Sequence, residues 1–278
     1  MKTRLFSLMT VAVLFLCSVS SGDAITWTTL DYPGALVTGL TGIDGSNIVG
    51  GYRGTSTEGA LLYNGTTWTV LDLPAGTGVT GVSGSNIVGK YGALPGSFLY
   101  NWTDHTTLNF PDIEIESIDG GNIVGEADGH GVIYNLDSQT WTTLDYPGAS
   151  STYIYDIDGD NLIGGYYASG AYHNFLYDGT IWMTLDLPGG ITGISGSNIA
   201  TQRGGIYNLI TQSWTAPLAF PGANITDVFD IDGNNIIGQY SKYFDGYKKH
   251  GFLAIVPEPA TIALFALGAF MLRRISRH

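Results

Sequence analysis

The feature that most constrains this chain is a unit of about 40 residues that recurs six times between Ile25 and Val256. Each unit contains four short apolar runs separated by turn signals. They read W-T-x-L-D-x-P, a run that ends in a D-G or S-G pair, N-I-V-G, and F-L-Y or a close variant. The prolines of the first run stand at positions 33, 74, 111, 147, 188 and 221. A repeat of this length indicates a solenoid or a propeller.

The content of the unit favours a propeller. Val, Ile, Thr and aromatic residues dominate the runs, which is typical of strands, and the D-G and S-G pairs suit tight hairpins. Four antiparallel strands per unit is the plan of a propeller blade. The chain opens with a lone first run, Thr26–Leu30, and closes with runs two to four, Thr226–Ala254. We therefore predict an all-β propeller of six four-stranded blades, closed by the N-terminal strand. The alternative is an open β-solenoid.

The two ends of the chain differ from the repeat, so we expect three parts: 1–24, 25–256 and 257–278. Residues 1–24 have a charged start, an apolar run from Leu5 to Cys17 and a small-residue end, as in a secretory signal peptide. Cys17 is the only cysteine and would be removed with the signal. A lipoprotein site at Cys17 fits less well, because Leu16 stands where a small residue is required.

Charge excludes one class of partner. The repeat region carries 22 acidic and 6 basic residues, a net charge of −16. Phosphate binding requires clustered Lys and Arg, so we expect no nucleic-acid partner. The same charge favours solubility and could attract divalent cations.

The C-terminal segment combines Pro257-Glu258-Pro259, the apolar run Ala260–Leu272 and a basic end that includes Arg273 and Arg274. Hydropathy alone would also allow a buried core helix. Its place at the end of the chain favours a short membrane helix that anchors the chain before processing, with its basic end on the cytoplasmic side.

These residues resemble the PEP-CTERM sorting signal. The resemblance implies a Gram-negative bacterium, an exosortase-type processing enzyme that cleaves near Pro257-Glu258-Pro259, and transient anchoring in the inner membrane. It also implies a place at the cell surface or in the extracellular matrix, where such systems accompany exopolysaccharide.

The repeats resemble the HAF family of extracellular repeats. The matching residues are His173–Tyr177 and His250–Leu253, together with the L-D-x-P-G and G-x-I-V-G elements. Most copies lack the histidine, which argues against a functional role for it. The resemblance implies fold and extracellular location, and it implies no chemistry.

The candidate metal site is Asp156, Asp158 and Asp160, which alternate around a Gly turn and could bind Ca²⁺ through oxygen ligands. Other copies of the same turn lack these carboxylates, so a plain hairpin turn is the competing interpretation. We expect no other cofactor.

A candidate ligand-binding set occupies one slot of the repeat, the aromatic position of L-x-Y/F-P. Its members, which could form a ring for stacking on sugars or could instead pack between blades, are Tyr32, Phe110, Tyr146 and Phe220.

No local catalytic motif is present. Acids could still meet in a propeller channel, and Asp119, Asp156 and Asp230 are the residues placed to do so. We therefore expect a non-enzymatic surface or matrix protein that binds or scaffolds polysaccharide. The alternative is a polysaccharide-active hydrolase or lyase.

Overall fold

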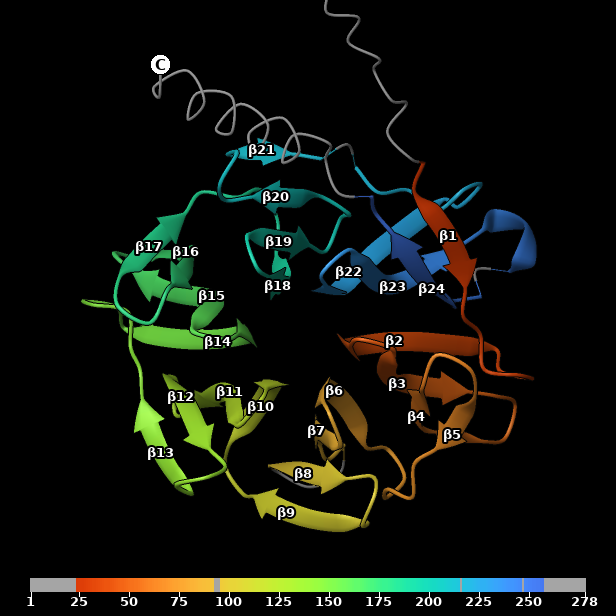
Figure 1. Cartoon of the computed structure of the whole chain (residues 1–278), viewed down its shortest axis with the longest axis horizontal. Helices are drawn as coiled ribbons and strands as arrows, with labels where there is room; N and C mark the ends of the chain where they lie inside the picture. Colours follow the sequence, from red (N-terminus) through yellow and green to blue (C-terminus); the bar gives the residue numbers. More distant parts are fainter. Residues whose placement is uncertain (1–23, 93–95, 216, 247, 258–278) are drawn as a thin grey trace, which may run out of the picture. The chain divides into compact units, whose positions relative to one another are not determined.

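Six four-stranded antiparallel sheets surround a common axis in the computed structural model (Figure 1). The structure describes residues 24–92, 96–215, 217–246 and 248–257. The sheets belong to one compact unit, Ile25–Val256. The predicted six-bladed propeller is confirmed.

The blades are numbered in chain order. Blade 1 is β2–β5, blade 2 is β6–β9, blade 3 is β10–β13, blade 4 is β14–β17, blade 5 is β18–β21, and blade 6 is β22–β24 with β1. The innermost strands are β2 (Val37–Asp44), β6 (Gly78–Ser83), β10 (Glu114–Asp119), β14 (Ser151–Asp158), β18 (Ile191–Ser195) and β22 (Ile225–Asp232). The second strands are β3 (Asn47–Arg53), β7 (Asn86–Lys90), β11 (Asn122–Ala127), β15 (Asn161–Ala168), β19 (Asn198–Thr201) and β23 (Asn235–Ser241).

The third strands hold the F-L-Y runs, and they are β4 (Glu58–Tyr63), β8 (Ser97–Asn101), β12 (His130–Asn135), β16 (Ala171–Tyr177), β20 (Ile206–Asn208) and β24 (His250–Ile255). The outermost strands hold the W-T-x-L runs, and they are β5 (Trp68–Val70), β9 (Thr106–Phe110), β13 (Thr140–Thr143), β17 (Trp182–Leu185), β21 (Ser213–Trp214) and β1 (Thr26–Thr29). One 3₁₀ turn, η1 (Tyr243–Asp245), precedes β24.

The ring closes as predicted, because β1 pairs with β24 from Thr26↔Ile255 to Thr29↔Phe252. The open solenoid is therefore wrong. A side-chain bond reinforces the closure. His250 Nδ1 lies 2.6 Å from Asp31 Oδ2, across 219 positions of sequence. Closure removes the free sheet edges that a linear stack would expose.

The core lies between neighbouring blades. One cluster, for example, joins Val88 of blade 2 to Ile115, Ile118 and Ile123 of blade 3. Each of these side chains is almost fully buried, which stabilises the fold by roughly 1.5–3 kcal/mol per residue. No blade could bury this surface alone, so the stability of each depends on its neighbours.

The glycine of N-I-V-G is explained by a close approach of backbone. A Cβ on Gly164 would lie 2.0 Å from the carbonyl oxygen of Tyr153 on β14, and Gly50, Gly125 and Gly238 have the same contact with their own inner strands. Any larger residue would force the two strands apart.

Several predictions concern residues outside the described part of the chain: the signal peptide, the C-terminal helix and, of the sorting residues, Glu258, Pro259, Arg273 and Arg274. Among the described residues, no helix combines the length and apolar character needed to cross a bilayer.

Candidate functional site

All six inner strands contain a β-bulge at the same place, where the pairing with the second strand shifts by one residue. A bulge leaves one residue unpaired and re-aims its side chain. Here the extra residues line a cavity in the central channel. We call them the mouth layer: Thr41, Thr80, Glu116, Tyr155, Thr192 and Phe229.

The residue after each bulge forms a second layer, the waist layer, whose members are Gly42, Gly81, Ser117, Asp156, Gly193 and Asp230. Asp156 is buried and joins three blades. Its Oδ1 accepts a hydrogen bond from Ser117 Oγ of blade 3 at 2.6 Å, and its Oδ2 accepts one from the Ile194 amide of blade 5 at 2.7 Å.

Asp230 is held in a similar way. Its Oδ2 accepts from the Ile43 amide of blade 1 at 2.9 Å, and its Oδ1 from the adjacent Ile231 amide at 2.8 Å. Gly193, between the two aspartates around the ring, leaves the space that Asp230 occupies. A Cβ there would lie 2.7 Å from Asp230 Oδ1.

Burial controls the protonation of this pair. Desolvation, the largest cause, raises the pKa of Asp156 to about 6, although hydrogen bonds from Ser117 and the amide of Ile194 oppose it. Desolvation also raises the pKa of Asp230 well above its ordinary value, and the charge of Asp156 adds to the effect. The waist therefore favours a protonated carboxyl over two desolvated anions in the same layer.

The last residue of each inner strand forms the latch layer: Asp44, Ser83, Asp119, Asp158, Ser195 and Asp232. Each side chain accepts a hydrogen bond from the amide of the first turn glycine in the next blade. The six bonds run Gly84→Asp44, Gly120→Ser83, Gly159→Asp119, Gly196→Asp158, Gly233→Ser195 and Gly45→Asp232, with distances of 2.5–3.0 Å. They form a closed circuit, which explains why the repeat has Asp or Ser, two acceptors, before glycine.

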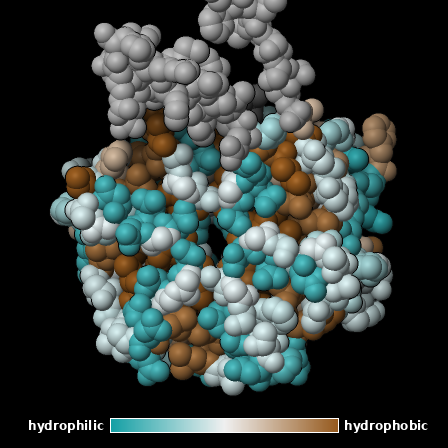
Figure 2. All heavy atoms as spheres, in the orientation of Figure 1, coloured by the Kyte–Doolittle hydropathy of each residue, from teal (hydrophilic) through white to brown (hydrophobic). Residues whose placement is uncertain are grey.

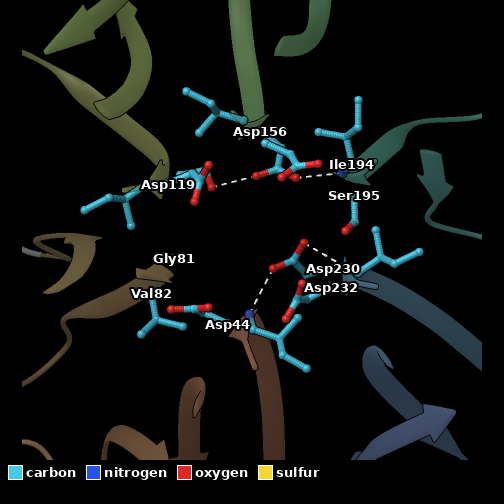
Figure 3. Close-up of a pocket in the computed structure, with 15 residues that line it drawn as sticks. Asp44, Gly81, Val82, Asp119, Asp156, Ile194, Ser195, Asp230 and Asp232 are labelled. Carbon is cyan, nitrogen blue, oxygen red and sulfur yellow. Dashed lines mark hydrogen bonds between the residues drawn. The ribbon is translucent and has the colours of Figure 1, made fainter. Parts of the chain in front are cut away.

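Two neighbouring cavities follow from these layers. The cavity at the mouth layer measures about 220 Å³, and the one between waist and latch about 60 Å³. Both are lined by Ser117, Asp156 and Asp230. Figure 3 shows the carboxylates of the waist and latch layers converging on the smaller cavity, and Figure 2 shows hydrophilic residues around a small opening at the axis.

Two mouth-layer side chains, Glu116 and Tyr155, have polar partners outside the layer. Glu116 pairs with Lys90 at 2.5 Å, and Lys90 lies 3.5 Å from Glu114 as well. Desolvation raises the pKa of Glu116 despite the lysine. Tyr155 shares a hydroxyl–hydroxyl bond of 2.6 Å with Tyr172, and burial raises its pKa too. The lysine charge is therefore already compensated by two carboxylates.

The three predicted calcium ligands lie in three different environments. Asp156 lies in the waist and Asp158 in the latch, where their oxygens accept the bonds described above, while Asp160 is exposed in the turn. Within the described ranges, no group of three or more acidic, histidine or cysteine side chains is arranged to hold a metal. Calcium binding at this turn stays a prediction, and the hydrogen bonds favour the hairpin interpretation.

The four aromatic candidates pack between blades and do not meet one another. Tyr146, for example, stacks on Tyr166 of the next blade with 3.7 Å between ring centroids, and Phe220 stacks on Tyr240 in the same way. Tyr32 contacts Tyr52 and Trp68, and Phe110 contacts Tyr134 and Trp141. These contacts favour the packing interpretation, and sugar binding by these rings stays a prediction.

Of the three acids expected in the channel, Asp119 belongs to the latch, whereas Asp156 and Asp230 meet at the waist. The sequence reasoning did not find the mouth layer. Its residues share no type, and a bulge has no clear signature in a short apolar run. One regularity could have located these residues, because each of them stands two positions before the repeated Ile or Val of its inner strand.

Comparison with solved structures gives matches of low identity. The chain is similar to the β-propeller domain of the Trilobed protease from Pyrococcus furiosus, with 11% identity, a TM-score of 0.49 and coverage of 79% of this chain and 94% of that chain. It is also similar to a luciferin-regenerating enzyme, with 11% identity and a TM-score of 0.49, over 84% of this chain and 95% of that chain. A third match is the Myceliophteria thermophila Cps50 (Swd1) β-propeller domain, with 9% identity and a TM-score of 0.44, over 83% of this chain and 99% of that chain. Similarity at this level supports no inference about ligand or activity.

No curated protein matches the chain. Residues 256–277, in contrast, match the PEP-CTERM protein-sorting motif. This match supports the resemblance found at Pro257-Glu258-Pro259. It implies that the chain is an exported protein with a C-terminal sorting signal, processed by an exosortase in a Gram-negative bacterium.

Proposed function

We propose that this chain is a non-enzymatic protein of the cell surface or extracellular matrix that binds or scaffolds a neutral polysaccharide at the mouth layer. The observation that carries the proposal is the composition of that layer. Three of its six positions are threonine, and the other three are Glu116, Tyr155 and Phe229, which bring a carboxylate and two aromatic rings into a cavity of about 220 Å³.

This set of groups suits a sugar. Hydroxyl and carboxylate oxygens can exchange hydrogen bonds with sugar hydroxyls, and Tyr and Phe rings provide rigid apolar faces with, for Tyr, a polar end. The cavity has roughly seven times the volume that one water occupies in the liquid, enough for a single sugar unit. A polymer would therefore enter by its end or by a side branch.

Charge argues for a neutral ligand. Glu116, Asp156 and Asp230 line the cavity, and the neighbouring Lys90 is paired with Glu116 and Glu114. An anionic sugar would meet carboxyl groups, and no lysine or arginine is among the described residues that line the cavity to offset its charge. The net charge of the repeat region, −16, acts in the same direction.

The sorting motif supports the location. A protein that an exosortase processes would be held briefly in the inner membrane by its C-terminal helix and then placed outside the cell. The resemblance of the repeats to HAF-type extracellular repeats agrees with this location, and exopolysaccharide is the partner that such a location offers.

A glycan array tests the proposal. The full chain, purified in mild detergent, is probed with neutral, amino and uronic acid oligosaccharides. In the double variant Tyr155→Thr/Phe229→Thr, every mouth-layer residue except Glu116 is threonine, and this variant should lose binding. The control Asp160→Asn, at an exposed turn, should keep it. Binding that prefers uronic acids, or that survives the double substitution, would contradict the proposal.

A second candidate is a polysaccharide-active enzyme, and one observation favours it. Asp156 and Asp230 line the mouth cavity with raised pKa values, and perturbed acids in a cleft are common at active sites. Product analysis after incubation with each bound polysaccharide separates the two functions. Cleavage by the wild-type chain that Asp156→Asn abolishes would establish the enzyme.

A further inference from the structure

One hairpin distinguishes blade 4 from the other blades. Among the described residues, strands β15 and β16 stay paired over seven positions, from Leu162↔Tyr177 to Ala168↔Ala171, whereas the corresponding strands of the other blades pair over six positions or fewer. Ser169 and Gly170 close it with positive φ values of 53° and 80°, as in a type I′ turn. The hairpin is therefore a regular ribbon and not an irregular loop.

The side chain of Tyr172 reaches across this ribbon toward the channel. A Cβ placed on Gly165 would fall 1.8 Å from Tyr172 Oη and 2.3 Å from Tyr172 Cζ. The Tyr172 ring therefore rests directly on the glycine backbone. Its hydroxyl bonds to that of Tyr155, a mouth-layer residue. Burial of this hydroxyl raises the pKa of Tyr172, so the group stays a neutral phenol.

Tyr167 extends the same surface outward. It is the cross-strand partner of Tyr172, with ring centroids 5.2 Å apart at 67°. Tyr167 is 45% exposed and Tyr172 is 42% exposed, so both rings are accessible to a ligand. Tyr155, Tyr172 and Tyr167 thus form a strip from the channel mouth toward the turn of the β15–β16 hairpin.

We propose that Tyr172 and Tyr167 form a second saccharide subsite, so that a neutral polysaccharide lies along blade 4 with one unit at the mouth layer and the next units on the two rings. The inference rests on the proposed function and adds the direction in which the chain runs. It also adds a minimum length, because a single sugar cannot occupy both places.

The fixed geometry makes the strip a suitable platform. Tyr172 is held by Gly165 and Tyr155, and Tyr167 by its cross-strand contact, so binding would immobilise little that is free in the unbound protein. Tyrosine offers a large contact face at low entropic cost together with a polar group. All three residues are tyrosines and none is a lysine or arginine, so the strip offers no cation that would attract an acidic polymer.

Chain length is the variable that tests the inference. Calorimetry on the full chain would compare β-1,4-linked glucose and β-1,4-linked N-acetylglucosamine oligosaccharides of one to six units. For the series that binds, affinity should rise at least tenfold between the monosaccharide and the trimer. Tyr167→Ala should reduce trimer affinity about tenfold, which corresponds to about 1.4 kcal/mol, and should leave monosaccharide affinity within twofold.

Two further variants complete the design. Gly165→Ala should displace Tyr172 and remove most of the gain with length, provided that its circular dichroism is unchanged. Phe244→Ala, which removes a fully exposed aromatic ring of blade 6, should change nothing. It is the matched control for the loss of an exposed ring.

The outcomes separate the two proposals. Equal affinity for monosaccharide and trimer, or a trimer affinity that Tyr167→Ala leaves unchanged, would overturn the second subsite and leave the mouth-layer proposal standing. Failure of both series to bind the wild-type chain would overturn both.

Discussion

The two ends of the central channel follow different rules. At one end, the latch layer holds only Asp or Ser, and each side chain accepts the same bond from the next blade. At the other end, the mouth layer holds Thr, Glu, Tyr and Phe at equivalent positions. Both layers come from the same six strands, a few residues apart. The latch repeats because the turn glycine of each blade needs the same acceptor from the blade before it, whereas the mouth can vary because no common bond requires a given residue type.

The largest expected effect concerns the repeated part of the fold. Gly164→Ala places a Cβ 2.0 Å from the Tyr153 carbonyl and about 2.7 Å from the Phe175 ring. Backbone cannot yield as a flexible side chain does, so we expect a loss of about 3 kcal/mol or more in the free energy of unfolding. Urea unfolding followed by tryptophan fluorescence measures it. Gly39→Ala, which meets nothing within 4 Å, is the control. Equal midpoints for the two variants would refute the close approach.

A substitution in the waist layer, between the latch and the mouth, should raise the free energy of unfolding instead of lowering it. The pKa of Asp156 in the folded protein, about 6, exceeds that of an unfolded aspartate, about 3.9. The folded state therefore binds more protons between these values, and stability falls as the pH rises from about 4 to about 6. Asp156→Asn removes this loss and keeps an acceptor for the Ile194 amide. It should be more stable than wild type at pH 7 by roughly 1–3 kcal/mol.

Urea midpoints at pH 4.5 and pH 7 measure this difference. The gap between Asp156→Asn and wild type should widen with pH, while Asp160→Asn, at an exposed turn, should follow wild type at both values. Some pH dependence will remain in the Asp156→Asn variant because the pKa of Asp230 is raised as well. A gap that narrows toward pH 7 would contradict the raised pKa.

The latch layer should tolerate exchange between its own two residue types. Asp158→Ala leaves the Gly196 amide without its acceptor and should cost about 1 kcal/mol, since the site is close to solvent. Asp158→Ser should cost less than half of that, because Ser83 and Ser195 perform the same role in blades 2 and 5. Thermal unfolding compares them, with Asp160→Ala as the control. If Ser proves as costly as Ala, the two latch types are not equivalent.

The repeat made the architecture predictable, and the reason is physical. A strand pattern that recurs six times, with a lone first strand at the N-terminus, can satisfy its edges only by closing, and β1 does pair with β24. The turn pairs were correctly predicted as hairpins. Their bonds to the neighbouring blade were not, because the Asp44–Gly84 contact crosses 40 residues and depends on how two sheets pack.

The candidate site was harder to predict, because it depends on departures from the repeat. The acids expected in the channel reach it, yet Asp119 and Asp158 serve the latch, which local sequence could not distinguish from a ligand role. The aromatic slot of Tyr32 and Tyr146 was compatible with either a binding surface or packing between blades, and the choice depends on their partners Tyr52 and Tyr166, which lie on strands of the next blade. Tyr155 appeared in the sequence as one residue of an ordinary strand, and only the bulge directs it into the channel.

The smallest expected effect tests whether side chains of the mouth layer contribute to the stability of the fold. Thr192 Oγ1 is buried and has no hydrogen-bond partner in the part of the chain that the structure describes, while the equivalent Thr41 Oγ1 donates to the Val79 carbonyl at 2.8 Å. Replacing an unsatisfied hydroxyl by a methyl group should help slightly, so Thr192→Val should be neutral or more stable by up to about 1 kcal/mol. Thr41→Val should lose about 0.5–1.5 kcal/mol. Opposite signs, measured by urea unfolding, would show that equivalent mouth positions differ in what they contribute to the fold. Equal losses would instead mean that the mouth, like the latch, is a repeated structural element, and would weaken its assignment as the binding end.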